Sequence, residues 1–184
     1  MKRRRIIKQR RRIFVAVEGA GEQAFIKFLQ HHSDQKGLNI HLDCETLNGG
    51  GYKTMFERAV HYRSRKGRNK VKAILIVDAD RAEKKDDGWS IEKLRAEVSK
   101  KNFAVCFQTP NQEGLLLRML PGKERLQPNA SETLKQLRKD WNGYQKPVDA
   151  HTLISKFSLN DMLRVADCDM ELKNLLIAIG LVKS

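Results

Sequence analysis

Two short apolar runs of this chain end in carboxylates. The first run, which ends at Val17, is followed directly by Glu18, and the second, which ends at Val77, continues into Asp78-Ala-Asp80. In an open α/β sheet the carboxyl ends of buried parallel strands border the crevice in which ligands bind. Acids gathered there repel one another unless a cation joins them, and hard divalent metals prefer oxygen ligands. The spacing therefore predicts that Glu18, Asp78 and Asp80 bind Mg²⁺ or Mn²⁺.

Each of these acids also has a purely structural interpretation. An aspartate after a strand often caps the next turn, and the dipole of a helix favours an acid near its N-terminus. Glu18 precedes an expected helix over residues 22–33, but Glu22 lies in the first turn of that helix and suits capping better. We therefore expect Glu22 to be structural and Glu18 to be a metal ligand or a general acid/base.

A fourth acid, Glu113, begins an expected helix soon after the fourth apolar run. In a parallel sheet it reaches the same edge as Glu18 and Asp78, either as a further catalytic acid that binds the metal or supports its ligands, or as a stabiliser of its own helix. Arg81, beside the Asp-x-Asp, is either a ligand of a scissile phosphate or a surface residue. Asn48-Gly-Gly-Gly51 either cradles a phosphate or forms a flexible turn, and the turn is favoured because the spacing is not that of a P-loop.

The elements that must position these residues follow from hydrophobic periodicity. Near-continuous apolar runs predict buried parallel strands, and strict alternation over 38–45 predicts an edge strand with one wet face. Apolar residues at helical spacing, with Ser90 and Asn111 as N-caps, predict the helices. The expected strands are 13–17, 38–45, 71–77 and 103–107, and the expected helices are 22–33, 52–60, 91–101, 112–120, 131–142, 150–157, 159–167 and 170–180.

The alternation of strands and helices up to residue 120 predicts an α/β domain with a mainly parallel sheet of about four strands flanked by helices. We expect a basic arm at 1–12, this domain at 13–127 and a helical extension packed on it at 128–184, with a polar loop at 82–88. No apolar run approaches the ~20 residues of a membrane span, and the basic start is not followed by a leader-like apolar region. Three widely spaced cysteines without zinc spacing fit free thiols in a reducing cytoplasm.

The chain is strongly basic, with 36 Lys and Arg against 22 Asp and Glu, and a net charge of +14. Eight basic residues and no acids lie within 1–12, and a second basic cluster consists of Arg63, Arg65, Lys66, Arg68, Lys70 and Lys72. Such clusters attract phosphate backbones through counterion release, although a basic tail can also be a solvated arm. We expect both clusters to flank the acid site and to hold RNA or DNA, with Arg63, Arg65, Lys66 and Arg68 in contact with it.

The glutamate after the first strand and the Asp-x-Asp after a later one resemble the Toprim signature, in which such acids hold Mg²⁺ for phosphodiester chemistry. Residues 13–147 are also similar to the RloB-like family of Toprim-related proteins. The similar segments are Val17-Glu-Gly-Ala-Gly-Glu-Gln-Ala-Phe25, Phe107-Gln-Thr-Pro-Asn-Gln-Glu-Gly-Leu-Leu-Leu-Arg-Met-Leu120 and Tyr144-Gln-Lys146. The sequence departs from the family at Gly21, where threonine is usual, and at Gln112 and Gly114, which flank Glu113.

This resemblance implies a Toprim-like Rossmannoid fold and a metal-dependent nuclease of bacterial anti-phage defence that acts on RNA such as tRNA. It also implies that Lys146 binds substrate and that an ATPase encoded nearby is a partner. Two other functions fit the residues: a non-catalytic nucleic-acid-binding module on the same scaffold, and a small-molecule phosphohydrolase or nucleotidyl-transferring enzyme. The sequence has no P-loop, which argues against self-contained NTP-driven work.

Overall fold

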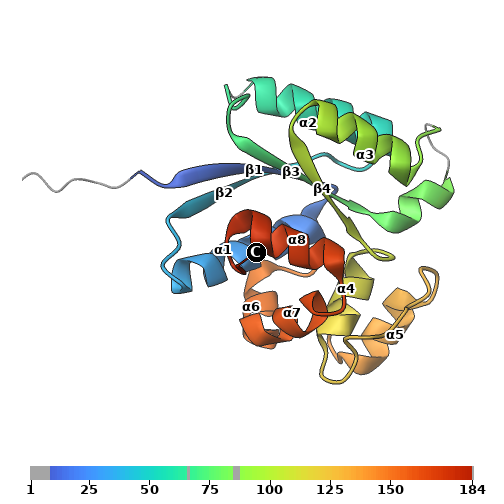
Figure 1. Cartoon of the computed structure of the whole chain (residues 1–184). Helices are drawn as coiled ribbons and strands as arrows, with labels where there is room; N and C mark the ends of the chain where they lie inside the picture. Colours follow the sequence, from blue (N-terminus) through green and yellow to red (C-terminus); the bar gives the residue numbers. More distant parts are fainter. Residues whose placement is uncertain (1–8, 66, 85–87, 184) are drawn as a thin grey trace, which may run out of the picture.

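The computed structural model describes residues 9–65, 67–84 and 88–183, and a four-stranded sheet lies at its centre (Figure 1). All three neighbouring pairs of strands run parallel. This arrangement confirms the predicted α/β class, with the alternating segment as an edge strand. The strands, in the spatial order β2-β1-β3-β4, are β1 (Arg11–Val17), β2 (Ile40–Thr46), β3 (Lys72–Asp78) and β4 (Phe103–Gln108).

The strand order reverses between β1 and β3. The chain first moves outward from β1 to β2, then returns past β1 to add β3 and β4 on the other side. Val17, the last residue of β1, is paired with Thr46 of β2 and with Ile76 of β3. Open α/β sheets bind ligands outside the carboxyl ends of their strands at such a reversal. Glu18 directly follows β1 and Asp78 ends β3, so two of the predicted acids border this point.

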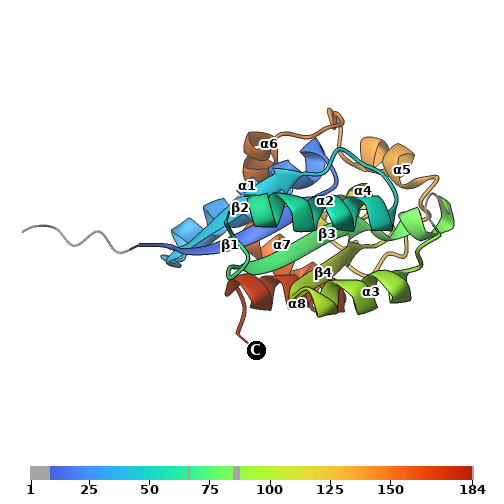
Figure 2. The same ribbon diagram turned by 90° about the horizontal axis from the view of Figure 1, so that it is seen from above.

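Helices cover both faces of the sheet (Figures 1 and 2). Phe14 and Leu75 point to the face packed by α2 and α3, whereas Val15 and Ile76 point to the face packed by the other helices. Because β1 and β3 are buried on both faces, their apolar residues form continuous runs. The helices are α2 (Tyr52–Arg65) and α3 (Ile91–Lys100) on the first face, and α1 (Ala20–Gln35), α4 (Gln112–Met119), α5 (Thr133–Asp140), α6 (Ala150–Lys156), α7 (Leu159–Ala166) and α8 (Met170–Ile179) on the second.

The four helices predicted after residue 128 are confirmed, and they pack into the core that α1 and α4 share. The ring of Trp141 meets Phe157 edge-on with centroids 5.3 Å apart, so this tryptophan helps to anchor the packing of these helices. The chain between α5 and α6 then brings Tyr144 and Lys146 to the carboxyl edge of the sheet. In the described ranges no helix combines the length and apolar character needed to cross a membrane, and the three cysteines are free.

Two segments correct the sequence predictions. Strand β1 begins at Arg11 rather than after residue 12, because the Arg11 N–H donates to the carbonyl oxygen of Asn39 (2.9 Å) and the strand pairs with β2 from there. Gln9 and Arg10 precede the strand, and Arg10 pairs with Asp34 (2.9 Å), whereas residues 1–8 of the predicted arm lie outside the described residues. A 3₁₀ helix, η1 (Ala79–Lys84), replaces the first part of the loop predicted at 82–88. The Asp80 N–H donates to the carbonyl oxygen of Pro110 (2.9 Å), which fixes the start of η1 against the end of β4.

Two of the departures from the family pattern have a packing reason. A β-carbon at Gly114 would lie 2.5 Å from Cδ of Pro110 and 3.1 Å from the carbonyl oxygen of Thr109, so only glycine lets α4 approach this turn. A β-carbon at Gly21 would lie 2.7 Å from Oε1 of Gln112, whose amide Nε2 donates to the Gly21 carbonyl oxygen (2.8 Å). Gly21 of α1 and Gln112 of α4 therefore contact each other and join the two helices.

These contacts predict unequal costs for two alanine substitutions. Gly114→Ala must displace the ring of Pro110 and backbone atoms, and we expect it to lower the free energy of unfolding by about 2 kcal/mol. Gly21→Ala meets only the end of a flexible side chain and gains helix propensity, so we expect a cost below about 1 kcal/mol. Urea unfolding of both variants measures the difference, and equal costs would contradict the packing argument.

Candidate functional site

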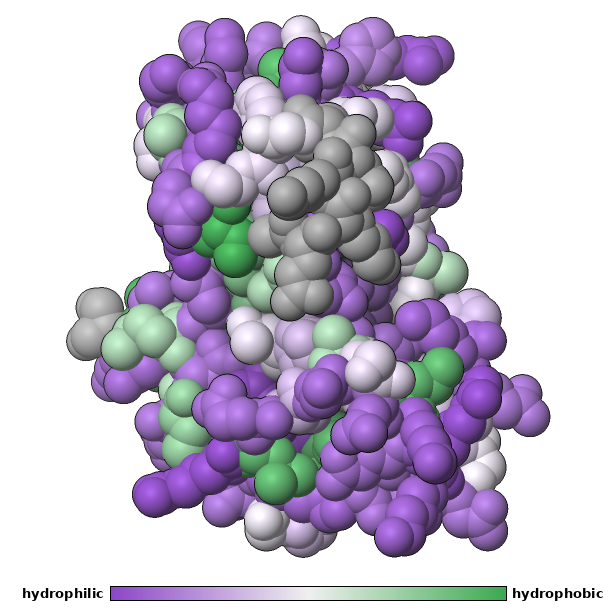
Figure 3. Space-filling model, turned by 90° about the vertical axis from the view of Figure 1, so that its right-hand side faces the viewer, coloured by the Kyte–Doolittle hydropathy of each residue, from purple (hydrophilic) through white to green (hydrophobic). Residues whose placement is uncertain are grey.

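A pocket of about 390 Å³ opens at the carboxyl edge of the sheet, where β1 and β3 end. Figure 3 shows this side of the molecule, and hydrophilic residues cover most of the surface drawn in colour. The structure brings all four predicted acids into the pocket, together with two of the predicted substrate-binding cations. The charged residues that line it are Glu18, Glu22, Asp78, Asp80, Glu113, Arg81 and Lys146.

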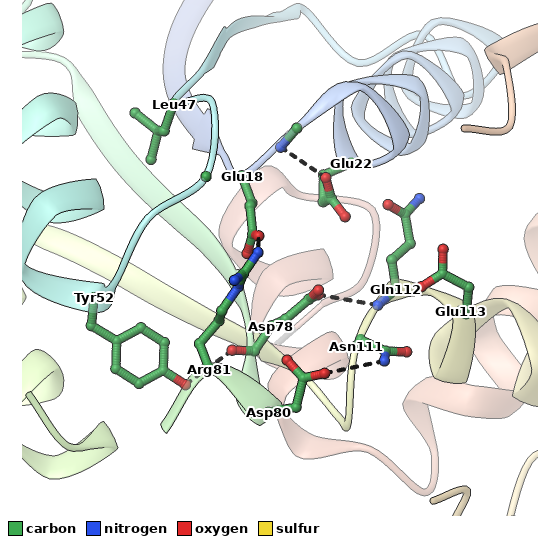
Figure 4. A network of polar contacts seen from close by, with 12 residues as sticks. Glu18, Glu22, Leu47, Tyr52, Asp78, Asp80, Arg81, Asn111, Gln112 and Glu113 are labelled. Carbon is green, nitrogen blue, oxygen red and sulfur yellow. Dashed lines mark hydrogen bonds and ion pairs between the residues drawn. The ribbon is translucent and has the colours of Figure 1, made fainter. Parts of the chain in front are cut away.

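Glu18 is buried just beyond the end of β1 and forms an ion pair with Arg81 of η1 (Figure 4). The hydrogen bond to Glu18 raises the pKa of Arg81, although burial of the guanidinium opposes the change. Oε2 of Glu18 and Nε of Arg81 have no hydrogen-bond partner among the described residues. The sequence allows Arg81 to be either a ligand of a phosphate or a surface residue. In the structure it lines the pocket and pairs with the carboxylate of Glu18.

Asp78 and Asp80 each have one polar partner from the start of α4. Oδ1 of Asp78 accepts the backbone N–H of Gln112 (3.1 Å), and Oδ2 of Asp80 accepts Nδ2 of Asn111 (3.4 Å) (Figure 4). Oδ1 of Asp80 has no partner among the described residues. Burial, reinforced by the nearby carboxylates Glu22, Glu18, Asp80 and Glu113, raises the pKa of Asp78 to about 8. The pocket therefore holds more acid than its own cations neutralise.

Glu113 is held on the opposite wall of the pocket by the segment between α5 and α6. Its Oε1 accepts the hydroxyl of Tyr144 (3.2 Å) and pairs with Nζ of Lys146 (2.8 Å). Burial opposes the charged form of Lys146, yet its hydrogen bond to Glu113 raises the pKa of the amine. Sequence reasoning reached Lys146 through resemblance and missed the contact made by Tyr144. The available signal was that a tyrosine hydroxyl in a core needs a polar partner.

Glu22 has the capping role predicted for it. Its Oε2 accepts the backbone N–H of Gly19 (2.9 Å) at the start of α1. Its side chain also lines the pocket, and burial, with Glu18 nearby, raises the pKa of the Glu22 carboxyl. Glu22 thus adds to the crowding of acids that the sequence attributes to the other four residues alone.

The loop of Asn48-Gly-Gly-Gly51 lies at the same edge and is fixed by hydrogen bonds. The Gly49 N–H donates to the carbonyl oxygen of Glu18 (3.1 Å). Nη1 of Arg58 donates to the carbonyl oxygens of Leu47 (2.7 Å) and Gly49 (2.9 Å). Asn48 and Gly49 line the pocket, and three consecutive positive φ angles, 59°, 70° and 116° at residues 48–50, explain the two glycines that follow the asparagine.

The second basic cluster does not flank the pocket, which corrects the sequence prediction. Arg63 lies in the last turn of α2 and Arg68 precedes β3, so both lie at the amino edge of the sheet. The guanidinium of Arg63 is buried and donates to four backbone carbonyls, those of Arg68, Lys101, Asn69 and Val71. Arg68 pairs with Asp43 (2.6 Å) and Glu45 (3.6 Å) of β2.

These pairings make Arg63 and Arg68 structural residues instead of phosphate ligands, because their charges are already neutralised or buried. Arg65 is exposed at the same end and keeps a free side-chain surface. Lys66 lies outside the described residues. Of the predicted substrate-binding residues, the structure thus brings Arg81 and Lys146 to the acids and separates Arg63, Arg65 and Arg68 from them.

The donor set of the pocket fits a hard divalent cation. Every candidate ligand is a carboxylate, and Oε2 of Glu18 and Oδ1 of Asp80 are buried oxygens that lack a partner among the described residues. In the described parts of the chain, however, no three acid, histidine or cysteine side chains already form a metal cluster. Glu18 pairs with Arg81, and Asp78 and Asp80 accept hydrogen bonds from the start of α4.

No model of a protein family, no curated protein and no solved structure matches this chain. The RloB-like and Toprim resemblance therefore stays a prediction that depends on the motifs quoted above. The arrangement of the pocket is independent of that resemblance, because it follows from the strand order and the contacts described here.

The burial of Arg63 predicts a large effect on stability. We expect Arg63→Ala to lower the free energy of unfolding by about 3 kcal/mol, because it removes four hydrogen bonds from a charged donor. Arg65 lies two residues further along α2 and is exposed, so Arg65→Ala should change the free energy of unfolding by less than about 0.5 kcal/mol. Thermal unfolding of the two variants compares them directly. A stable Arg63→Ala protein with weakened nucleic-acid binding would restore the role predicted from sequence.

The raised pKa of Asp78 predicts a pH-dependent stability in metal-free buffer. In the folded chain this carboxyl stays protonated up to about pH 8, whereas in the unfolded chain it ionises near pH 4. Between these values unfolding releases a proton, so the contribution of Asp78 to stability falls as pH rises. Asp78→Asn keeps an acceptor for the Gln112 N–H, and we expect it to exceed wild type at pH 8 by a free energy on the order of a few kcal/mol.

Urea unfolding in EDTA at pH 5 and pH 8 measures the difference in stability between Asp78→Asn and wild type, which should be small at the lower pH. Glu57→Gln, an exposed position on α2, is the control and should show no comparable change. A gap of the same size at both pH values would contradict burial of an ionisable Asp78 as its cause.

Proposed function

We propose that this protein is a divalent-metal-dependent nuclease that hydrolyses phosphodiester bonds of nucleic acid. The observation that carries the proposal is the meeting of Glu18, Asp78 and Asp80 at the reversal of a parallel sheet, in a pocket with five acids and two cations. Such a surplus of buried negative charge calls for a cation, and the oxygen donors suit Mg²⁺ or Mn²⁺. Following the resemblance, the proposed substrate is RNA such as tRNA, in cytoplasmic anti-phage defence with an ATPase partner encoded nearby.

In this proposal Asp78, Asp80 and Glu18 hold the metal, which when bound stabilises charge on phosphoryl oxygens and supplies an activated water. The protein groups on the opposite wall act on the substrate itself. Lys146 is half-exposed beside Glu113 and can turn its amine to a phosphate oxygen. Glu113, which accepts the Tyr144 hydroxyl, would accept or return a proton as general acid/base.

One observation favours a second candidate, a phosphohydrolase or nucleotidyl-transferring enzyme for small molecules. The basic cluster near α2 lies at the other edge of the sheet, so no continuous basic groove built from the described residues frames the 390 Å³ pocket. A pocket of this volume is of the size that encloses a single small ligand. A nucleotide satisfies that constraint, and its phosphate could meet the same acids and Lys146.

The test is a cleavage assay with wild type and an Asp78→Asn/Asp80→Asn double variant. Each is incubated with Mn²⁺ or Mg²⁺ and a mixed pool of tRNA, single-stranded DNA, double-stranded DNA and nucleotides. We expect wild type to cleave a polymer and the double variant to lose at least about 10³-fold in rate, because the charge stabilisation is lost. Mn²⁺ should also raise the melting temperature of wild type and leave that of the double variant unchanged.

Cleavage of nucleotides without cleavage of polymers would replace the nuclease by the second candidate. Equal binding of tRNA by both proteins, with no cleavage and no Mn²⁺-dependent stabilisation, would instead indicate a non-catalytic binding module. Adding the ATPase encoded nearby to the inactive mixture separates an enzyme that requires its partner from a protein without activity.

A further inference from the structure

We propose that Arg81 is an internal cation that occupies Glu18 until a divalent metal displaces it, and that the released guanidinium then binds an anionic oxygen of the substrate. This inference rests on the proposed function, since it takes the metal to bind among the same acids. It concerns the order in which ligands enter the pocket and assigns Arg81 two successive partners.

The first support is the position of the guanidinium. Arg81 directly follows Asp80 in η1, and its side chain extends past Asp78 to Glu18 (Figure 4). The side chains of Glu18 and Arg81 are 11% and 23% exposed, so the pair is largely removed from water. A divalent cation that uses Glu18 as a ligand must therefore compete with a guanidinium that already neutralises it.

The second support is that both partners keep unused hydrogen-bonding capacity. Oε2 of Glu18, Oδ1 of Asp80 and Nε of Arg81 are buried and have no partner among the described residues. Buried polar atoms without partners are unusual in folded proteins and indicate a place for a ligand or water. A guanidinium has five N–H donors in a planar fork that suits phosphate oxygens, so Arg81 gains a matching partner once it leaves Glu18.

The other cation of the pocket provides a comparison. Lys146 pairs with Glu113 on the opposite wall, and its side chain is 55% exposed. Removal of either cation makes the pocket more negative, and this general effect should tighten metal binding modestly in both cases. Only Arg81 blocks a carboxylate that the metal is proposed to use, so only its removal should add a specific gain.

The test measures binding of Mn²⁺ alone by titration calorimetry to wild type, Arg81→Gln, Lys146→Gln, Glu18→Gln and the Glu18→Gln/Arg81→Gln pair. We expect Arg81→Gln to bind Mn²⁺ about ten-fold more tightly than wild type, and Lys146→Gln to gain less than about three-fold. With Glu18 already replaced, Arg81→Gln should gain no more than Lys146→Gln, because the competition has been removed. Circular dichroism confirms that each variant is folded, and Arg81→Met, which keeps an apolar stem without the charge, replaces Arg81→Gln if the latter is not.

The second arm measures inorganic phosphate in the presence of saturating Mn²⁺. We expect Arg81→Gln to bind phosphate about ten-fold more weakly than wild type although it binds the metal more tightly, because the freed guanidinium is missing. Opposite changes in the two affinities are the signature of the proposed exchange. Equal gains for Arg81→Gln and Lys146→Gln, or weaker Mn²⁺ binding by Arg81→Gln, would overturn it.

The two proposals fail in different ways. If neither wild type nor Arg81→Gln binds Mn²⁺, the metal site and this inference both fall. If Mn²⁺ and phosphate follow the expected order but no polymer or nucleotide is cleaved, the exchange stands and the enzymatic proposal falls. If wild type cleaves nucleic acid and Arg81→Gln binds Mn²⁺ with unchanged affinity, the enzymatic proposal stands and the exchange falls.

Discussion

Crowding of carboxylates at the ends of β1 and β3 is the constraint on which the rest of the structure depends. Burial of Asp78, reinforced by the nearby carboxylates, raises its pKa to about 8, so these acids cannot all remain ionised without compensation. The compensation comes from several directions. Arg81 and Lys146 supply charge, and the N-termini of α1, α2 and α4 turn their positive dipole ends toward the same edge.

The parallel sheet creates this problem and also limits it. Parallel strands with helical crossovers bring every strand end and every following helix start to one edge, so acids placed after strands must meet there. The same geometry presents the unpaired amide of Gln112 to Asp78, which is a partner that needs no side chain. The C-terminal helices matter because the chain between α5 and α6 adds Tyr144 and Lys146 to the lining of the pocket.

Local signals made most of the fold predictable. The caps at Ser90 and Asn111 are confirmed by their hydrogen bonds, because a cap depends on residues within one turn. The meeting of the acids was predictable too, since topology alone brings strand ends together. The partner with which each charged side chain pairs was not predictable from the sequence. Whether Arg63 faces solvent or four carbonyls, and whether Arg81 finds a phosphate or Glu18, depends on segments distant in sequence.

The second basic cluster lies at the opposite edge of the sheet from the acid pocket. Only a ligand long enough to span the sheet can contact both. Strand β3 has seven residues and is therefore about 23 Å long, with exposed Arg65 and Lys70 near its start and the acid pocket at its end. A single nucleotide is too short to touch both regions, so the cluster would not contribute to its affinity. A polynucleotide that enters the pocket could reach it across several phosphates. Dependence of affinity on Arg65 and on salt therefore reports the length of ligand for which this surface is built.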